Sequence, residues 1–353
     1  MKINQLDTPC LIIDKAAFDE NRRTLQTLMQ HTNMQLRPHY KSHRCPAIAR
    51  LQMQDGAKGM TCAKLGEAED LAAAGIQDIL IANQIVQPEK LPRLAELAGK
   101  CRLTVCVDCA ENVLALEKAL AETGHTLYCL VEYDIGMKRC GVDTHEEVLA
   151  LAALIAKQQH LRFDGVQAYA GQMSHEVSLS VRTSATDAIE QDLIILRDKL
   201  AAAGMPAREI SGGSTGMIEQ KPRDSVYTEM QCGSYLFMDQ CYRQLGLAFR
   251  HSLYLLTTVV SIKPDRIVTD GGTKALGMDQ GDPVFVGYEG CPVRMSEEHG
   301  QIEAPGHTCK INDKIRYIPG HCCTTMNSHD RVYVTEGDDV VDVWEITSRG
   351  KCW

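Results

Sequence analysis

The sequence predicts an α/β protein, in which a (β/α)8 barrel is followed by an all-β domain. Over the first two thirds of the chain, short apolar and β-branched runs alternate with longer amphipathic stretches. This alternation is typical of a parallel sheet that helices cover. The helical period disappears after residue 245, and turn residues then separate short strand-like runs. A chain of 353 residues also exceeds what one hydrophobic core usually supports, so two domains are expected.

Eight apolar runs predict the barrel strands. They are Met34–Lys41, Lys58–Ala63, Asp78–Asn83, Arg102–Asp108, Thr126–Asp134, Arg162–Ala170, Glu209–Thr215 and Glu229–Phe237. The helical stretches between them are Pro46–Asp55, Gly66–Ala74, Pro88–Gly99, Ala110–Thr123, His145–Gln159 and Val177–Ala203. Eight such units in one row suit a closed barrel better than an open doubly wound sheet. The last helix, after Gly216, is expected to be short or irregular.

The rest of the chain predicts β-structure. The expected strands are Thr257–Thr269, Pro283–Tyr288, Lys314–Ile318, Arg331–Thr335 and Val340–Ile346. Turn residues such as Asp270-Gly271-Gly272 join them. Thr8–Ile13 predicts an extra strand that pairs with this domain. We therefore expect residues 15–245 to form the barrel, and residues 1–14 together with 246–353 to form the β domain.

Charge and composition exclude several classes of protein. The net charge of −9 and the pI near 5.8 argue against a nucleic-acid partner, which needs a basic face. No apolar run approaches the roughly 18 residues that span a membrane, and acidic residues stand where a signal peptide would be apolar. A cytoplasmic protein is expected. The fifteen cysteines are scattered and odd in number, so most are expected to be buried free thiols.

Barrel enzymes place their chemistry at the C-terminal ends of the strands. Lys41 ends the first predicted strand, where a lysine either reaches solvent along its stem or is buried as a Schiff-base nucleophile. After the seventh strand, Ser211-Gly212-Gly213-Ser214-Thr215-Gly216 offers backbone N–H groups and hydroxyls in a compact turn, which suits a phosphate. Gly233-Ser234-Tyr235 would add donors. A Schiff-base lysine facing a phosphate site suggests pyridoxal 5′-phosphate.

Several motifs occur in order along almost the whole chain. They are T-P-C-L-I-I-D, R-P-H-x-K-x-H, G-M-K-R-C-G-V, Q-A-Y-x-G-x-x-x-H, S-G-G-S-T-G, E-M-Q-C-G-S-Y-x-F-M-D and P-G-H-x-C. Together they resemble the D-threonine aldolase and D-serine dehydratase family. Its members are pyridoxal phosphate enzymes with an alanine-racemase-like barrel and a β domain. The resemblance implies a lyase that acts on small β-hydroxy-D-amino acids and forms a homodimer.

The resemblance also assigns roles to residues. Lys41 looks like the lysine that binds the cofactor covalently, Arg139 like the arginine that contacts its phenolic oxygen, and Tyr169 like an aromatic residue of the pocket. The phosphate site is implied to comprise Ser211, Gly213, Ser214, Thr215, Gly216, Gly233 and Ser234. His175 resembles the base that acts on the substrate's β-hydroxyl. Gln231 stands where related racemases have an arginine facing the pyridine nitrogen. Since glutamine cannot protonate that nitrogen, a fully protonated ring is not expected. Without the resemblance, Tyr169 could be a core aromatic residue and His175 a loop histidine.

A metal site is expected in the β domain. His321 and Cys323 are two apart, so in an extended chain they point to the same side. His307 and Cys309 have the same spacing, and it is the resemblance that selects His321 and Cys323. Two protein ligands leave positions open for water and substrate, as a catalytic site requires. Thiolate softness favours Zn²⁺ over Mn²⁺ or Mg²⁺.

Members of this family catalyse one of two reactions. The barrel motifs look more like the aldolases, which break the Cα–Cβ bond and release glycine and an aldehyde. The His/Cys pair looks more like the dehydratases, which act on D-serine or 3-hydroxy-D-aspartate and release a ketoacid and ammonia. We expect the aldolase. An amino-acid racemase is a remote alternative, because a racemase would have no use for the metal-ligand pair His321 and Cys323. A non-catalytic cofactor carrier and a metal-only hydrolase on a barrel are further alternatives. Ser296–Gly300 also matches a family segment, with no role assigned.

Overall fold

The computed structural model describes residues 1–220 and 224–353, and the chain forms two compact units. The barrel unit comprises Gln26–Lys41, Ile48–Gly233 and Lys351–Trp353. The β unit comprises Met1–Leu25, Ser42–Ala47 and Ser234–Gly350. The domain boundaries expected from the sequence stay a prediction. The described residues hold no helix with both the length and the hydrophobicity needed to cross a bilayer.

Eight parallel strands form the sheet of the barrel unit. They are β2 Gln35–Leu36, β3 Met60–Cys62, β4 Asp78–Ile81, β5 Arg102–Val107, β6 Leu127–Glu132, β7 Leu161–Ala168, β8 Glu209–Gly212 and β9 Glu229–Met230. Their order is β2-β9-β8-β7-β6-β5-β4-β3. A parallel bridge between His39 and Thr61 joins the two ends, and the Thr61 amide donates to the Pro38 carbonyl at 2.8 Å. These contacts close the sheet, which confirms the predicted barrel fold.

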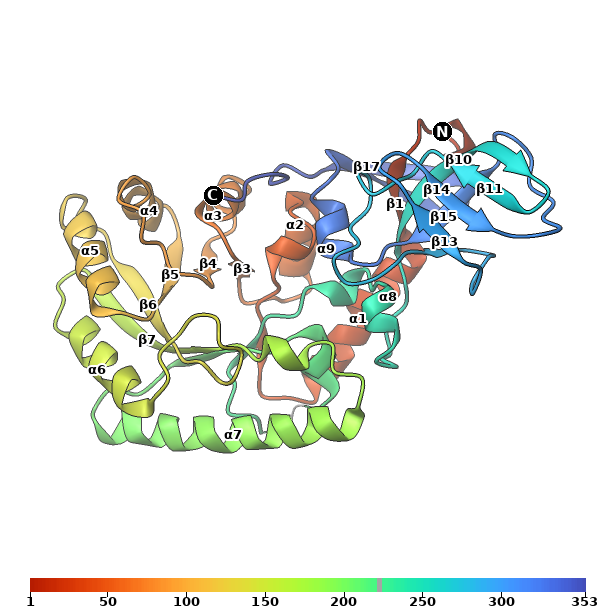
Figure 1. Ribbon diagram of the computed structural model, residues 1–353. Coiled ribbons are helices and arrows are strands. Elements are labelled where there is room, and N and C mark those ends of the chain that lie inside the picture. Colours follow the sequence, from red (N-terminus) through yellow and green to blue (C-terminus); the bar gives the residue numbers. More distant parts are fainter. Residues whose placement is uncertain (221–223) are drawn as a thin grey trace. The chain divides into compact units, whose positions relative to one another are not determined.

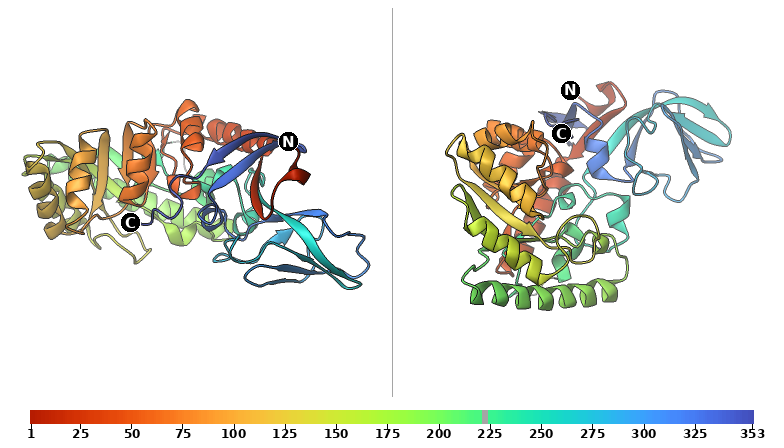
Figure 2. Two further views of the ribbon diagram at one scale, coloured as in Figure 1. Left: turned by 90° about the horizontal axis from the view of Figure 1, so that it is seen from above. Right: turned by 60° about the vertical axis from the view of Figure 1, so that its left-hand side comes forward.

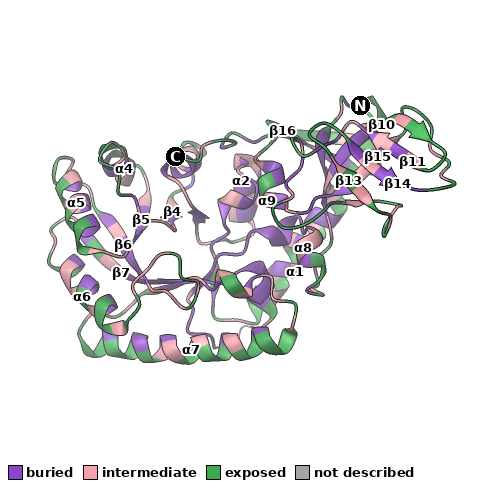
Figure 3. Ribbon diagram, viewed as in Figure 1, coloured by how far each residue is buried: buried purple, intermediate pink, exposed green. Residues whose placement is uncertain are grey.

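Helices cover the outer face of this sheet (Figures 1 and 2). Those wholly within the barrel unit are α3 Leu65–Ala73, α4 Leu91–Ala98, α5 Ala110–Ala121, α6 His145–Ala156 and α7 Leu179–Ala202. The helices α1 Lys15–Gln30 and α2 Pro46–Gln54 share residues with both units. Thr144 caps α6 by accepting from the Glu147 amide at 3.2 Å, and Ser178 caps α7 in the same way. Figure 3 shows their inner faces buried and their outer faces exposed, as amphipathic helices require.

The first and last barrel strands are shorter than predicted. The strand expected over Met34–Lys41 is regular only at Gln35–Leu36, and a 3₁₀ turn, Tyr40–Ser42, follows it. Pro38 has no N–H group to donate to the ladder, which explains the early end. The strand expected over Glu229–Phe237 ends at Met230, and the chain turns at the 3₁₀ helix Ser234–Leu236. The expected irregular last helix is the 3₁₀ helix Thr215–Gln220.

The β unit contains a nine-stranded sheet. Its strands are β1 Cys10–Asp14, β10 Leu253–Lys263, β11 Arg266–Thr269, β12 Val284–Phe285, β13 Val293–Met295, β14 Gly300–Glu303, β15 Lys314–Ile318, β16 Arg331–Glu336 and β17 Asp339–Glu345. The short helices α8 Gln240–Arg243 and α9 Cys322–Met326 complete it. β1 pairs antiparallel with β10 and parallel with β16, which confirms the predicted pairing of the N-terminal strand.

One expectation for the β unit was wrong, and one hairpin was missed. The single strand expected over Thr257–Thr269 is two antiparallel strands, β10 and β11, which meet at a turn containing Pro264 and Asp265. The hairpin of β13 and β14 was not expected; the segment Ser296–Gly300 forms its turn and the first residue of β14. Both strands are short and mixed in polarity, so no alternation marks them in the sequence.

Candidate active site

Lys41 lies just beyond β2, at the C-terminal end of the barrel strands. The backbone on its N-terminal side is held firmly, because the bridge to Thr61 anchors His39 and the fully buried Tyr40 donates from its hydroxyl to Asp70 at 2.7 Å. The Lys41 side chain is half-buried, and its Nζ lies 5.8 Å from the centroid of the Tyr169 ring. The amine is thus neither free in solvent nor enclosed, which suits a group that must be reached by a small molecule.

A cavity of about 170 Å³ opens beside Lys41. Its lining consists of His39, Lys41, Ala63, Ala82, Asn83, Arg139, Cys140, Gln167, Tyr169 and Gln231. Four of the predicted site residues, Lys41, Arg139, Tyr169 and Gln231, therefore share one cavity, although the chain separates the first from the last by 190 positions. All the lining residues belong to the barrel unit. The roles of these residues stay predictions.

Arg139 and Tyr169 lie close together in this cavity. The Arg139 guanidinium carbon is 5.6 Å from the Tyr169 ring centroid, within cation–π range. Its Nη2 lies 3.8 Å from the Glu132 carboxylate, and the Arg139 side chain stays half-exposed. Burial raises the pKa of Glu132, against the opposing effects of the Gln84 amide and Arg139. Arg139 therefore keeps donors available for a ligand oxygen.

The glycine-rich segment forms a tight turn after β8. Gly213 has a φ of +72°, a conformation that favours glycine. The buried Arg182 side chain donates to the Gly216 carbonyl at 2.8 Å and so holds the far end of the turn. Among the described residues the buried Ser214 hydroxyl has no hydrogen-bond partner. Since buried hydroxyls are normally paired, this orphan group fits an anion-binding turn.

Gly213→Ala is expected to weaken cofactor binding about tenfold or more, because the φ of +72° is strained for alanine and its relaxation would distort the turn; an added Cβ would also displace the end of the Met230 side chain, 2.4 Å away. The positive φ alone costs about 1 kcal/mol for alanine. Gly204→Ala is the matched control, since Gly204 has a φ of +75° and a Cβ added there would meet no atom within 4 Å. Both variants should lose similar stability in thermal unfolding, and only Gly213→Ala should lose affinity in a pyridoxal phosphate titration. Equal affinities would contradict the phosphate assignment.

The remaining predicted residues of the barrel motifs lie elsewhere. His175 is in a turn after the 3₁₀ helix Gly171–Met173 and is not part of the cavity lining. Gly233 is a buried residue of the barrel unit. Ser234 opens a 3₁₀ helix of the β unit, with its Oγ 3.9 Å from the Cys323 Sγ.

The predicted metal ligands His321 and Cys323 do come together in the β unit, but not on an extended chain as expected. His321 caps α9 in an extended conformation, and Cys323 is in the first turn of that helix. The two side chains are hydrogen-bonded. Burial opposes the charged imidazole, but Cys323 and Asp279 outweigh this effect and raise the pKa of His321 to about 9.

Sequence reasoning missed Asp279. Its carboxylate contacts His321 Nδ1 at 2.7 Å and accepts from the Thr324 hydroxyl at 2.6 Å. A carboxylate behind a histidine is the usual way to orient a metal ligand, but Asp279 is 42 positions before His321 and no spacing rule connects them. Within the described ranges, no group of three or more His, Cys, Asp or Glu residues has metal-binding geometry. His307 and Cys309, the other pair with this spacing, contact the Lys263 carbonyl and the Tyr288 hydroxyl respectively.

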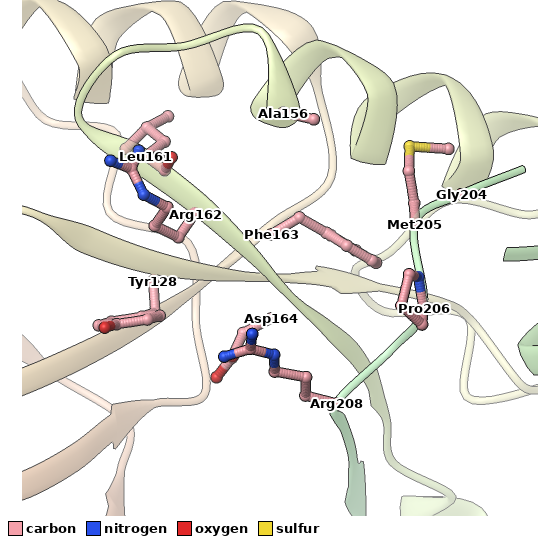
Figure 4. A pocket seen from close by; sticks show the side chains of 10 residues that line it. All are labelled: Tyr128, Ala156, Leu161, Arg162, Phe163, Asp164, Gly204, Met205, Pro206 and Arg208. Carbon is pink, nitrogen blue, oxygen red and sulfur yellow. Dashed lines mark hydrogen bonds between the residues drawn. The ribbon is translucent and has the colours of Figure 1, made fainter. Parts of the chain in front are cut away.

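A larger cavity, of about 610 Å³, lies at the opposite ends of the strands (Figure 4). Tyr128 is the second residue of β6, Leu161 begins β7, and Arg208 directly precedes β8. The N-terminal face of a barrel usually serves stability rather than chemistry. Here the Arg102 guanidinium carbon lies 3.6 Å from the centroid of the Tyr128 ring, and Arg102 donates to Asp164 at 2.5 Å, so the Asp164 carboxylate is paired within the fold. We therefore take the smaller cavity as the candidate active site.

Comparison with known proteins gives a consistent result over the whole chain. The family model "Alanine racemase, N-terminal domain" matches residues 13–241, and a model of a serine dehydratase domain matches residues 252–335. A D-threonine aldolase of Arthrobacter sp. is 37% identical over 98% of this chain and 93% of its own length. A 3-hydroxy-D-aspartate aldolase of Paracoccus denitrificans (strain Pd 1222) is 36% identical over 99% of this chain and 94% of its own.

Solved structures agree with this result. The crystal structure of a D-threonine aldolase from Filomicrobium marinum matches with a TM-score of 0.94 and 34% identity, and covers 100% of this chain and 98% of that one. A D-threo-3-hydroxyaspartate dehydratase from Delftia sp. HT23 matches with a TM-score of 0.89 and 25% identity, over 98% of each chain. The sequence of that dehydratase is 28% identical to this one, so it is more distant than the aldolases.

Proposed function

Because this chain belongs to the alanine-racemase-like family that includes the D-threonine and 3-hydroxy-D-aspartate aldolases, we propose that it is a pyridoxal phosphate-dependent lyase. Its proposed substrates are β-hydroxy-D-amino acids, and its proposed products are glycine and an aldehyde. Identities of 37% and 36% over nearly the whole chain support the aldolase reaction over the dehydratase reaction.

One observation carries the proposal: the cavity that joins the Lys41 amine to Arg139, Tyr169 and Gln231 at the C-terminal ends of the strands. We propose that Lys41 binds the cofactor carbonyl carbon, that Arg139 donates to the phenolic oxygen, and that Tyr169 covers the ring. The phosphate would be held by Gly213, Ser214, Thr215, Gly216, Gly233 and Ser234, with Ser211 at the start of the turn. The orphan Ser214 hydroxyl supports this assignment. When bound, pyridoxal phosphate supplies an electron sink for negative charge that develops at the substrate Cα.

His175 is the proposed base for the substrate's β-hydroxyl proton. An imidazole is the side chain best suited to accept a proton near neutral pH. His175 lies in a turn after the 3₁₀ helix Gly171–Met173, six positions after Tyr169, and we propose that it takes the proton directly or through a water molecule. For a dehydration, the Lys41 amine would instead be the base.

His321 and Cys323 are the proposed ligands of one divalent metal ion, with Zn²⁺ favoured over Mn²⁺ or Mg²⁺ because of the thiolate. Such an ion would supply Lewis acidity toward the β-hydroxyl oxygen. The hydrogen bond between the two side chains supports this pairing, because it brings an imidazole nitrogen and a sulfur close together. We also propose a homodimer, as the resemblance to the family implies, and, separately, a cytoplasmic location.

The dehydratase remains the second candidate, because Cys323 matches the His/Cys pair of the dehydratases. The test is to incubate the purified enzyme with D-threonine, D-serine and 3-hydroxy-D-aspartate, and to measure glycine, aldehyde, ammonia and ketoacid. We expect glycine and an aldehyde in equal amounts from D-threonine or 3-hydroxy-D-aspartate. The L-enantiomers are the control and should give no product. Ammonia and a ketoacid as the main products would show the dehydratase.

A further inference from the structure

Gln231 is held in one orientation at the edge of the proposed cofactor cavity. Its Nε2 donates to Gln167 Oε1 and to the Ser211 hydroxyl oxygen, each at 2.7 Å. An amide nitrogen has two hydrogens, so both are used. Within the described part of the chain, the Gln231 Oε1 has no partner, and Gln231 lines the cavity that contains Lys41. The group that Gln231 can offer to a ligand is therefore an acceptor.

A charged carboxylate behind Ser211 sets this orientation. The Ser211 hydroxyl donates to Glu229, so its oxygen can only accept from Gln231. Glu229 is almost fully buried, and its Oε2 lies 2.8 Å from Arg37 Nε and 3.3 Å from Lys58 Nζ. Burial opposes ionisation, but these partners outweigh it and keep the pKa of Glu229 below its usual value. A flipped Gln231 would place its oxygen against the Ser211 oxygen without a hydrogen between them.

The neighbourhood of Gln231 indicates which cofactor atom it would meet. Gln231 follows β9, and its backbone N–H donates to the Gly212 carbonyl at 2.9 Å, next to the turn proposed for the phosphate. In pyridoxal phosphate the ring nitrogen is opposite the carbon that carries the aldehyde. One ring carbon separates the nitrogen from the carbon that carries the phosphate arm. With the aldehyde carbon at Lys41, the nitrogen faces away from the lysine and toward the side chains beside the phosphate turn.

This inference rests on the proposed function. We propose that the Gln231 oxygen accepts a hydrogen bond from a protonated ring nitrogen, and that Ser211 and Glu229 are positioning residues that orient Gln231 for it. The proton comes from solvent when the cofactor binds. Glutamine cannot protonate the nitrogen, as the sequence predicts, but an acceptor fixed at this point stabilises the protonated form. The electron sink would then be stronger than the sequence alone suggests.

The test is ¹⁵N NMR of the holoenzyme reconstituted with pyridoxal phosphate labelled at the ring nitrogen. At pH 8 the wild-type spectrum should show the protonated nitrogen, with a one-bond coupling to hydrogen. Ser211→Ala removes the link between Gln231 and Glu229 and should move the resonance toward the unprotonated position. Ser211→Thr keeps the hydroxyl and should restore the wild-type resonance. Thr228→Val is the matched control, because the Thr228 hydroxyl donates to Glu209 at 2.7 Å on the same strand pair but does not contact Gln231.

An unprotonated nitrogen in the wild-type enzyme would overturn the inference while leaving the proposed function intact. An unchanged resonance in Ser211→Ala would overturn the positioning role. If Ser211→Ala does not fold, Gln231→Leu decides, since it removes the acceptor and should give the unprotonated resonance. Failure of labelled cofactor to bind at Lys41 at all would instead overturn the proposed function, and is recognised by the missing absorbance of the bound cofactor.

Discussion

Replacing Lys41 with alanine is expected to lower kcat by about 10³-fold or more, because the amine is the group that binds the cofactor covalently. The same change should remove the absorption band that is expected near 420 nm for the wild-type holoenzyme. Pyridoxal phosphate joined to an amine typically absorbs at about 420 nm. Turnover of D-threonine and the absorption spectrum are the two measurements. The variant should fold, since Lys41 is half-buried and its Tyr40 neighbour keeps the anchor to Asp70.

Lys100→Ala is the control for this result, because Lys100 is exposed and lies before β5, at the opposite ends of the barrel strands. It should retain both turnover and the band. A Lys41→Ala enzyme that keeps the band and turns over at a rate near that of the wild type would contradict the assignment of the cofactor site.

Removal of the metal is expected to cost about 100-fold or more in turnover while leaving the 420 nm band in place. The loss of a group that stabilises charge in the transition state typically costs about this much. His321→Ala should have the same effect as a chelator, since it removes one of two proposed ligands. Metal content by mass spectrometry and turnover with and without added Zn²⁺ are the measurements.

The chain contains its own control for the metal prediction. His307→Ala alters the other pair with the same spacing, whose histidine contacts the Lys263 carbonyl. This variant should keep its metal and its turnover. Activity that survives complete chelation, or a metal content that His321→Ala leaves unchanged, would show that His321 and Cys323 do not hold a catalytic ion.

The barrel was predictable because its signals are local. Continuous apolar runs such as Arg102–Val107 are buried on both faces of a parallel sheet, and amphipathic stretches between them have the helical period. Strand ends were less predictable. The apolar run after Met230 resembles a strand, but its residues are buried in a 3₁₀ turn, and periodicity does not distinguish these two kinds of buried segment.

The site was predictable only where family motifs mark it. Lys41, Arg139, Tyr169 and Gln231 line one cavity, as a shared role requires. The contacts of Asp279 with His321 could not be predicted, because they join residues 42 positions apart with no motif. The link from Glu229 through Ser211 to Gln231 was also beyond the sequence. It depends on the pairing of β8 with β9, which places Ser211 beside Glu229.

The most direct measurement is to reduce the holoenzyme with borohydride, digest it and locate the phosphopyridoxyl group by mass spectrometry. Borohydride makes the bond between the cofactor and its lysine permanent, so the modified peptide identifies the amine. We expect the added mass on the peptide that contains Lys41, and its disappearance when substrate amine displaces the lysine before reduction. A phosphopyridoxyl group on any other lysine, or none in an enzyme that is active with its cofactor, would contradict the account.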